Sequence, residues 1–335
     1  MEGLISLNHG SGGKQTHELI SKVFAKSFGM SGPLTDSAVL KIAGSSIAFT
    51  TDSYVVDPLF FPGGNIGKLA VCGTVNDLAV SGARPLFLSA SFIIVEGFPV
   101  SKLSDIVASM AEEARKAGIQ IVTGDTKVVE KGKCDGMFIT TSGTGTVLPE
   151  REHISSGSRI TPGDKLIING PLGNHAIAVL GARNNLSFTT PVVSDCASLN
   201  TMIESVCNGC SEIHFMRDLT RGGLAAVLNE LAGMTEKGLL INESSILVDE
   251  PVRGACEMLG FDPICLANEG KVLIVTGAGS EVEVLEIMRS DPAGRLSAII
   301  GEIVSDDRHH VIMNTITGGK RIVDMPSGIL LPRIC

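Results

Sequence analysis

Apolar positions recur along the chain with two different periods, and they predict both strands and helices. β-branched residues fill 47–56, as is typical of a strand, and a helix of small residues is expected from Gly63-Gly64 to Pro85. Residues 86–95 form a short apolar run that predicts a buried strand. The other elements expected in this half are a helix at 101–118, strands at 119–122 and 137–147, and a turn at 124–127.

A polar stretch at 149–164 separates this half from a second one and is the best domain boundary. The elements predicted there are helices at 195–207, 224–231 and 281–289, and strands at 272–275, 298–304 and 311–313. Because strands follow one another with few crossovers in the first half, the pattern favours a mixed α+β architecture over a doubly wound sheet. A length of 335 residues suits two domains of roughly 150 residues each.

The composition is apolar on average, but no segment is long enough to cross a membrane. Hydrophobic residues make up 44% of the chain and the mean hydropathy is +0.30, yet no run reaches the roughly 18 to 20 uncharged residues of a span. The first residues show no signal or transit peptide, so we expect a cytoplasmic protein. A net charge of -9 argues against nucleic-acid binding, and an anionic substrate would need local cations or a metal ion.

Two familiar phosphate-binding motifs are absent from the sequence. Gly67-Lys68 lacks the rest of a Walker A loop, since residue 62 is a proline and Leu69 follows the lysine. Gly143 and Gly145 lack the third glycine and the following helix of the dinucleotide fingerprint. The sequence therefore argues against a P-loop enzyme and against a nicotinamide-dependent one.

Aspartates recur just beyond an apolar segment or in a predicted turn. They are Asp36, Asp52, Asp77, Asp125 and Asp218. Magnesium takes carboxylate oxygens of this kind, with waters and substrate phosphates completing its octahedron. An aspartate at such a place is also a common cap or turn former, and for any one of them alone that interpretation is favoured. Together they make a dispersed metal-nucleotide site conceivable.

Two glycine-rich segments offer free backbone amides. The first, HGSGGK at 9–14, ends in Lys14 and could fold over a triphosphate, although such a terminal stretch is often disordered. In the second, RDLTRGG at 217–223, Thr220 can cap a following helix whose amides and Arg221 face an anion. The arginines and the aspartate of this segment could equally form a plain surface ion pair.

Eight cysteines are scattered along the chain, and the last of them is the final residue. Cys207 and Cys210 have CxxC spacing but neither a second pair nor a thioredoxin-like setting, which favours two unrelated thiols. The seven histidines do not cluster, and we assign them no role. Cys335 ends the tail that begins at Pro326, and such a tail could extend about 30 Å at roughly 3.3 Å per residue. A frayed terminus is the alternative, but the apolar pair Leu330-Leu331 suggests that the tail docks.

Seven stretches spread over the whole chain resemble the HypE family of hydrogenase maturation factors. They are HGSGGK, TDSYVVDPLFFPGGNIGKLAVCGT, ND.AVSGA, GDTKVV, RD.TRGG, ANEGK and the terminal PRIC. The terminal PRIC together with GDTKVV is the most specific part of the match. The family belongs to a wider superfamily with aminoimidazole ribonucleotide synthetase, selenophosphate synthetase and thiamine-phosphate kinase.

The resemblance implies a two-domain α/β fold that dimerises through its N-terminal domains and uses ATP with Mg²⁺. It further implies that a HypF-type partner places a carbamoyl group on Cys335, and that the chain dehydrates it to a thiocyanate while ATP becomes ADP and phosphate. The cyano group, destined for the iron of [NiFe] hydrogenase, then passes to a HypC-HypD complex. The implied domains are a flap and helix at 1–34, an ATP-binding and dimerisation domain at 35–150, a C-terminal domain at 151–325 and a mobile tail at 326–335.

The resemblance also assigns roles to individual residues. Glu269 in ANEGK is the expected general base, with Lys127 orienting the carbamoyl oxygen or sharing the proton transfer. The expected magnesium ligands are Asp36, Asp52, Asp77 and Asp218, and the expected nucleotide contacts are Lys14, Asn76, Gly124, Asp125, Thr126 and Arg221. Two other functions stay open at this point: a scaffold with a docking tail, and a superfamily kinase or amidoligase acting on a free substrate.

Overall fold

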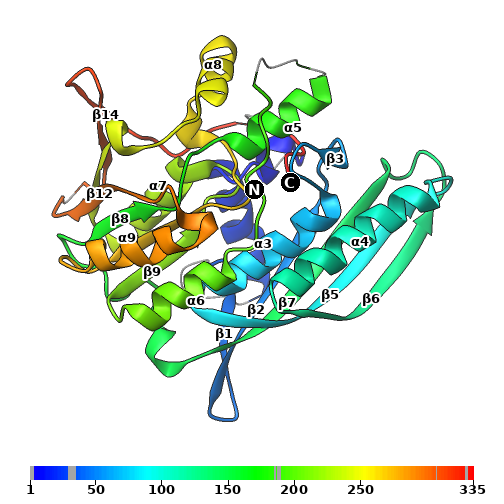
Figure 1. Cartoon of the computed structure of the whole chain (residues 1–335), viewed down its shortest axis with the longest axis horizontal. Coiled ribbons are helices and arrows are strands. Elements are labelled where there is room, and N and C mark those ends of the chain that lie inside the picture. Colours follow the sequence, from blue (N-terminus) through cyan, green and yellow to red (C-terminus); the bar gives the residue numbers. More distant parts are fainter. Residues whose placement is uncertain (1–3, 29–34, 185, 187–189, 307, 329–330) are drawn as a thin grey trace.

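A computed structural model describes residues 4–28, 35–184, 186, 190–306, 308–328 and 331–335. The chain forms two mixed sheets, each with its own helices (Figure 1). The first sheet has the order β1 (Ala38–Ile42), β2 (Ser45–Tyr54), β7 (Met137–Val147), β5 (Ala83–Val95) and β6 (Gln120–Val129). β5 and β6 run parallel and the other neighbours are antiparallel. The predicted mixed α+β class is confirmed.

The second sheet is built from seven short strands. Its order is β14 (Lys320–Ile322), β13 (Val311–Asn314), β10 (Gly238–Asn242), β12 (Ala298–Val304), β8 (Lys165–Ile168), β11 (Val272–Thr276) and β9 (Ile213–Asp218). Side chains alternate between its faces, as they must in a strand. Leu166 and Ile168 pack toward α7 (Gly223–Thr235), whereas Ile167 packs toward α6 (Asn200–Gly209) and α9 (Glu281–Ser290).

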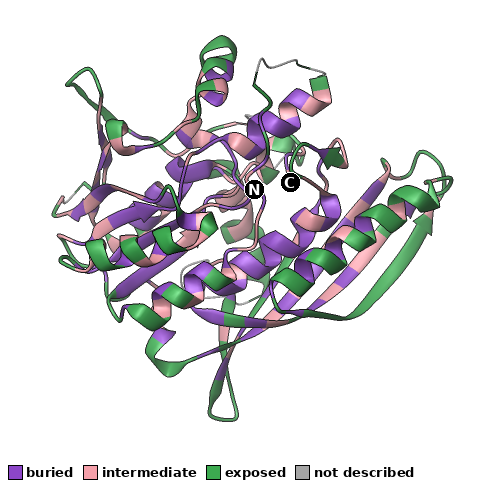
Figure 2. Cartoon of the chain, in the orientation of Figure 1, coloured by how far each residue is buried: buried purple, intermediate pink, exposed green. Residues whose placement is uncertain are grey.

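Helix α3 (Ile66–Val80) joins the two halves. Asn65 caps its first turn by accepting from the amides of Gly67 and Lys68. The helix packs on β2, β5 and β7 of the first sheet, on α4 (Val100–Lys116) beside it, and on α6 and β9 of the second half. It is buried along nearly all its length (Figure 2). Residues on α3 therefore lie between the two domains, where a shared site can form.

Several shorter elements complete the two halves. They are α1 (Lys14–Leu19), the helical turns Ile20–Ala25, α2 (Lys26–Phe28), β3 (Phe60–Phe61), β4 (Gly64–Asn65), α5 (Asn174–Asn184) and α8 (Glu250–Leu259). None of the helices in the described ranges is long and apolar enough to cross a membrane.

Three predicted elements differ from the structure. Pro85 does not end α3 but lies inside β5, at a register shift against β7 where a missing N–H is tolerated. The predicted turn at 124–127 is part of strand β6, and Gly124 is needed there because a Cβ would collide with the carbonyl of Ala90. The helix predicted at 195–207 begins only at Asn200.

Candidate active site

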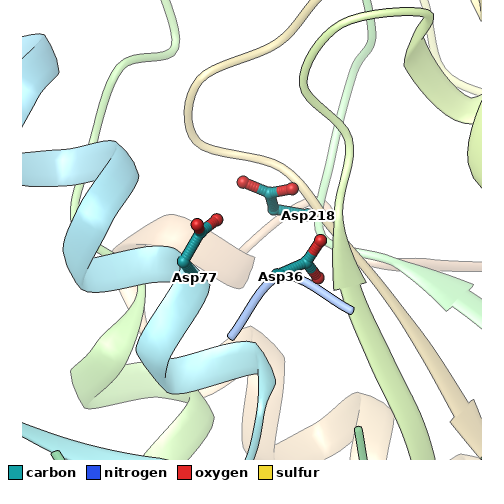
Figure 3. A group of neighbouring side chains, drawn as sticks. All are labelled: Asp36, Asp77 and Asp218. Carbon is teal, nitrogen blue, oxygen red and sulfur yellow. The ribbon is translucent and has the colours of Figure 1, made fainter. Parts of the chain in front are cut away.

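Three aspartates from three different elements converge between the domains. Asp36 lies just before β1, Asp77 is on α3, and Asp218 ends β9. One oxygen of each carboxylate lies within 4.8 Å of the others, and the side chains face a common centre (Figure 3). We call these three residues the aspartate cluster.

The aspartate cluster carries more negative charge than its surroundings compensate. Burial raises the pKa of all three carboxyl groups, and repulsion from neighbouring carboxylates raises those of Asp77 and Asp218 further. The Arg217 guanidinium, whose Nε lies 3.1 Å from the Asp36 carboxylate, acts in the other direction and lowers the pKa of Asp36. A set of oxygen donors with surplus negative charge suits a hard divalent cation such as Mg²⁺, so the residues fit the metal that the sequence implies.

Asp52 on β2 lies beside the aspartate cluster without belonging to it. Its carboxylate accepts a hydrogen bond from the hydroxyl of Thr74 at 2.8 Å, and its charge is the largest electrostatic contribution that raises the pKa of Asp77. Burial raises the pKa of Asp52 itself. The hydroxyl of Thr50 donates to Asp77 at 2.8 Å. Asp52 thus adds negative charge at the edge of the same site.

Glu269 is a buried carboxylate with an unmet hydrogen-bonding atom. Its side chain is 3% exposed, and its Oε1 has no hydrogen-bond partner among the described residues. The carboxylate of Asp195 holds the backbone by accepting from the amides of Glu269 at 3.4 Å and Gly270 at 3.2 Å. Burial raises the pKa of Glu269 well above its ordinary value, the charge of Asp218 raises it further, and Arg221 opposes both.

The last residue of the chain lies at this same site. Burial raises the pKa of the Cys335 thiol to about 12, Arg221 opposes the rise, and Glu269 and Asp52 add to it. Cys335 and Arg221 also line one common cavity. The Cys335 carbonyl accepts from the amide of Val55 at 3.0 Å. The end of the tail is therefore docked on the segment that follows β2, at the cavity that Arg221 lines.

A cavity of about 270 Å³ opens next to Cys335. Its walls come from the tail, from Gly10 and Ser11 near the N-terminus, and from Arg221-Gly222 before α7. Glycine is required at residue 223, because its φ is +60° and a Cβ would meet the Leu266 carbonyl at 2.5 Å. The cavity is thus bounded by a glycine-rich helix N-terminus and an arginine, a setting that favours phosphate.

Comparison with known proteins agrees with this geometry. The model of the AIR synthase related protein N-terminal domain matches residues 34–147, and that of its C-terminal domain matches 161–314. Carbamoyl dehydratase HypE of Rhodobacter capsulatus is 49% identical over 336 residues, which cover 99% of this chain and 98% of the relative. The same enzyme of Escherichia coli K12 is 45% identical over 338 residues, with 99% of each chain covered. The chain belongs to the HypE family.

Solved structures of the HypE family have the same fold as this chain. The crystal structure of a HypE-HypF complex aligns with a TM-score of 0.87 at 49% identity, covering 92% of this chain and 99% of the other. HypE in complex with ATP aligns with a TM-score of 0.83 at 44% identity, covering 99% and 100%. AaThiL complexed with AMPPCP and TMP, with a TM-score of 0.65 at 15% identity, covers 91% and 97% and shares the fold alone.

Two further residues predicted for this HypE site have different surroundings. Lys14 is the exposed first residue of α1, next to Gly13, which packs against the Pro326 carbonyl. Asn76 on α3 donates to the Ala197 carbonyl at 3.0 Å and accepts from the amide of Leu199 at 2.7 Å. Both ends of its amide therefore hold the non-helical segment before α6.

The predicted GDTK residues are not brought to the site within one chain. β6 lies at the edge of the first sheet, separated from β2 by β7 and β5, which amounts to about 14 Å across three strand spacings. Lys127 is 69% exposed, and its Nζ pairs with Asp125 at 2.8 Å. Gly124 and Thr126 are exposed on the same strand.

The sequence did not predict a row of paired charged side chains that ends at the aspartate cluster, or a histidine that contacts the tail. His17 on α1 bonds Glu230 on α7 at 2.8 Å, Glu230 pairs with Arg217, and Arg217 pairs with Asp36. His175 on α5 contacts the tail backbone. No spacing in the sequence predicts these contacts, because each joins residues from separate elements that come together only in the folded chain.

Proposed function

We propose that this chain is an ATP-dependent carbamoyl dehydratase that acts on a carbamoyl group carried by its own Cys335 and yields a thiocyanate. The observation that carries the proposal is the docked end of the tail, where Cys335 lines the same cavity as Arg221 and the charges of Glu269 and Asp52 raise the pKa of its thiol. The names of its relatives, carbamoyl dehydratase HypE, support the same reaction. The product serves the cyanide ligand of [NiFe] hydrogenase.

The reaction balances with ATP as the second substrate. The carbamoyl oxygen attacks the γ-phosphorus, the bond to ADP breaks, and the oxygen becomes part of a phosphate leaving group. The nitrogen then loses its two protons while the C–O bond breaks, which leaves a C≡N group on sulfur together with ADP and phosphate. Activation by phosphoryl transfer is needed because an amide oxygen is a poor leaving group.

Residues of the chain have separate tasks in this scheme. Glu269 takes protons from the carbamoyl nitrogen, a role suited to a buried carboxylate whose raised pKa makes it a stronger base. Arg221 and the amides at the start of α7 face the phosphate groups. The aspartate cluster would hold Mg²⁺, assisted by Asp52, and the ion would neutralise charge on the phosphates.

We propose that a homodimer completes the site. The face of the first sheet away from α3 and α4 exposes Phe49 and Phe87, which lie on the same row across β7. The edge strand β6 is exposed along nearly its whole length (Figure 2), and its Val122 is 56% exposed. A second copy covering this face would bury them and bring its own β6 near this site. Lys127, together with Gly124, Asp125 and Thr126, would then serve the nucleotide of the other subunit.

The proposed partners follow from the chemistry of the tail. A HypF-type carbamoyltransferase loads Cys335, and the solved complex of a HypE relative with HypF supports this partner. A HypC-HypD complex accepts the cyano group. All eight cysteines are free thiols, which supports a reducing compartment, the cytoplasm.

The test is the mass of the C-terminal peptide. After incubation with a HypF-type enzyme, carbamoyl phosphate and ATP, the peptide that begins at Asp324 should gain a carbamoyl group and then lose one water. A Cys335→Ala chain should show neither change and no substrate-dependent ATP cleavage. ATP cleavage that survives in the Cys335→Ala chain would favour a kinase of a free substrate instead.

A further inference from the structure

The end of the tail runs antiparallel to residues 55–57 and is held through its main chain. The amide of Val55 donates to the Cys335 carbonyl at 3.0 Å, and the amide of Asp57 donates to the Arg333 carbonyl at 3.2 Å. This is the pattern of an extended peptide added to an existing segment, in which backbone hydrogen bonds supply the affinity.

Arg183 on α5 donates to main-chain carbonyls with three of its guanidinium nitrogens. Nη1 donates to Pro332 at 2.8 Å, Nη2 to Arg333 at 2.7 Å, and Nε to Asp57 at 2.7 Å. The arginine thereby joins both antiparallel segments. Its distance to the Asp57 carboxylate is longer, 3.9 Å, so the carbonyl contacts define its position. A rigid planar fork is well suited to fixing two consecutive carbonyl groups.

His175, also on α5, takes the next carbonyl of the tail. Its Nε2 lies 2.8 Å from the Ile334 carbonyl, and because a carbonyl only accepts, Nε2 carries the proton. Nδ1 then accepts from the hydroxyl of Ser194 at 2.8 Å, while that hydroxyl accepts from the amide of Cys196 at 3.1 Å. The imidazole is fully buried, and burial lowers its pKa, which favours this neutral tautomer.

Every carbonyl from 332 to 335 is therefore paired with a fixed donor, and none of these contacts involves the sulfur. We propose that Arg183 and His175 form a docking site that recognises the tail by its main-chain carbonyl groups and thereby fixes the position of Cys335. Such a site holds the thiol, its carbamoyl form and its cyano form equally well. Arg183 and His175 are positioning residues, and their value to catalysis rests on the proposed function.

The experiment measures how well docking protects Cys335 from a thiol reagent, and it needs neither ATP nor a loaded tail. The full chain is treated with iodoacetamide, and labelling is followed on the Asp-N peptide 324–335, which contains Cys335 alone. We expect Arg183→Ala and His175→Ala to label at least about fivefold faster than the unchanged chain, since each removes hydrogen bonds that hold the docked state. His175→Gln, which keeps a donor of similar reach, should restore much of the protection.

Matched controls separate docking from general loosening. Arg289→Ala removes a guanidinium that clasps the Ser297 carbonyl, and His153→Ala removes an imidazole that contacts the Ile213 carbonyl, both away from the tail. Neither change should alter labelling of Cys335, and the buried Cys210 should stay protected throughout.

Equal labelling of Cys335 in the unchanged, Arg183→Ala and His175→Ala chains would overturn the docking site, whatever the activity. If these variants label faster but the unchanged chain shows no dehydration of a carbamoylated tail, the docking site stands and the proposed function is refuted. If His175→Ala also exposes Cys210 to the reagent, that variant has lost its fold, and Arg183→Ala alone decides.

Discussion

Substitution of Glu269 by glutamine tests two properties of this residue, its role as a general base and the effect of its buried charge on stability. Glutamine keeps the shape of the side chain and replaces one carboxylate oxygen by an amide nitrogen, so it cannot ionise. The backbone contacts of residues 269 and 270 with Asp195 have no reason to change. If Glu269 takes protons from the carbamoyl nitrogen, dehydration should slow by about 10²- to 10⁴-fold, the usual contribution of a general base. This corresponds to about 3 to 5 kcal/mol of lost transition-state stabilisation.

The same substitution should stabilise the fold at high pH. The Glu269 carboxyl is 3% exposed, and its Oε1 is unpaired among the described residues, so ionising it in the folded chain lacks compensation. Its folded pKa is raised above 4.5, which means that stability present below the unfolded pKa is lost as the pH rises through the folded pKa. Glutamine does not titrate. The variant should match the unchanged chain near pH 4.5 and exceed it by about 1 to 3 kcal/mol at pH 8.

Two measurements check this pair of expectations. Single-turnover dehydration of the carbamoylated tail, followed by peptide mass, gives the rate, and calorimetry gives ATP affinity, which should be unchanged. Thermal unfolding at several pH values gives the stability difference. Glu113→Gln is the control, because Glu113 is 6% exposed but accepts from Ser198 at 3.1 Å and lies outside the proposed chemistry. A Glu269→Gln rate within threefold of normal would remove this residue from the mechanism.

Three further predictions concern the metal site and the sheet face. Mg²⁺ should raise the unfolding temperature at pH 7.5, by neutralising the aspartate cluster, and Asp77→Asn should abolish most of that increase; an equal increase in the variant would exclude this cluster as the site. When a chelator is present, the unfolding temperature should rise as the pH falls from 8 to 6. The folded pKa values of the aspartate cluster are raised, so protonation removes the repulsion between its buried charges, and Asp77→Asn should weaken this pH dependence. Val122→Lys on β6 should shift a dimer to monomers in sedimentation, whereas Val282→Lys, on a 59% exposed residue of α9, should not.

Sequence patterns predicted most of the regular elements because one face of each element is buried and the other is more exposed. The β-branched stretch that became β2 and the helical spacing that became α4 were recognisable from the sequence. The turn expected at 124–127 failed because the sequence does not say why Gly124 lacks a side chain, and the reason is the nearby Ala90 carbonyl. A glycine needed for close approach looks the same in a sequence as a glycine needed for a turn.

The candidate site was predictable in its residue types and not in its distances. Recurrent aspartates after apolar segments indicated a metal site, and three of them do converge. The docking contacts of His175 and Arg183 could not be predicted, since their partners are main-chain carbonyls about 150 residues away that any sequence would supply. The family resemblance supplied Glu269, whose unpaired oxygen only the structure reveals.

Burial acts on Glu269 and Cys335 in the same direction but with opposite chemical results. It disfavours the charged form of each. The Glu269 carboxylate is therefore a stronger base whenever it is ionised, whereas the Cys335 thiol stays protonated because its pKa is raised to about 12. Only a thiolate is a good nucleophile, so a docked Cys335 is poorly suited to accept a carbamoyl group. An undocked cysteine in water, with a pKa of about 8.5, is far better suited to it. The site thus favours chemistry on a group that is already attached, in agreement with the proposed loading of Cys335 by a separate enzyme.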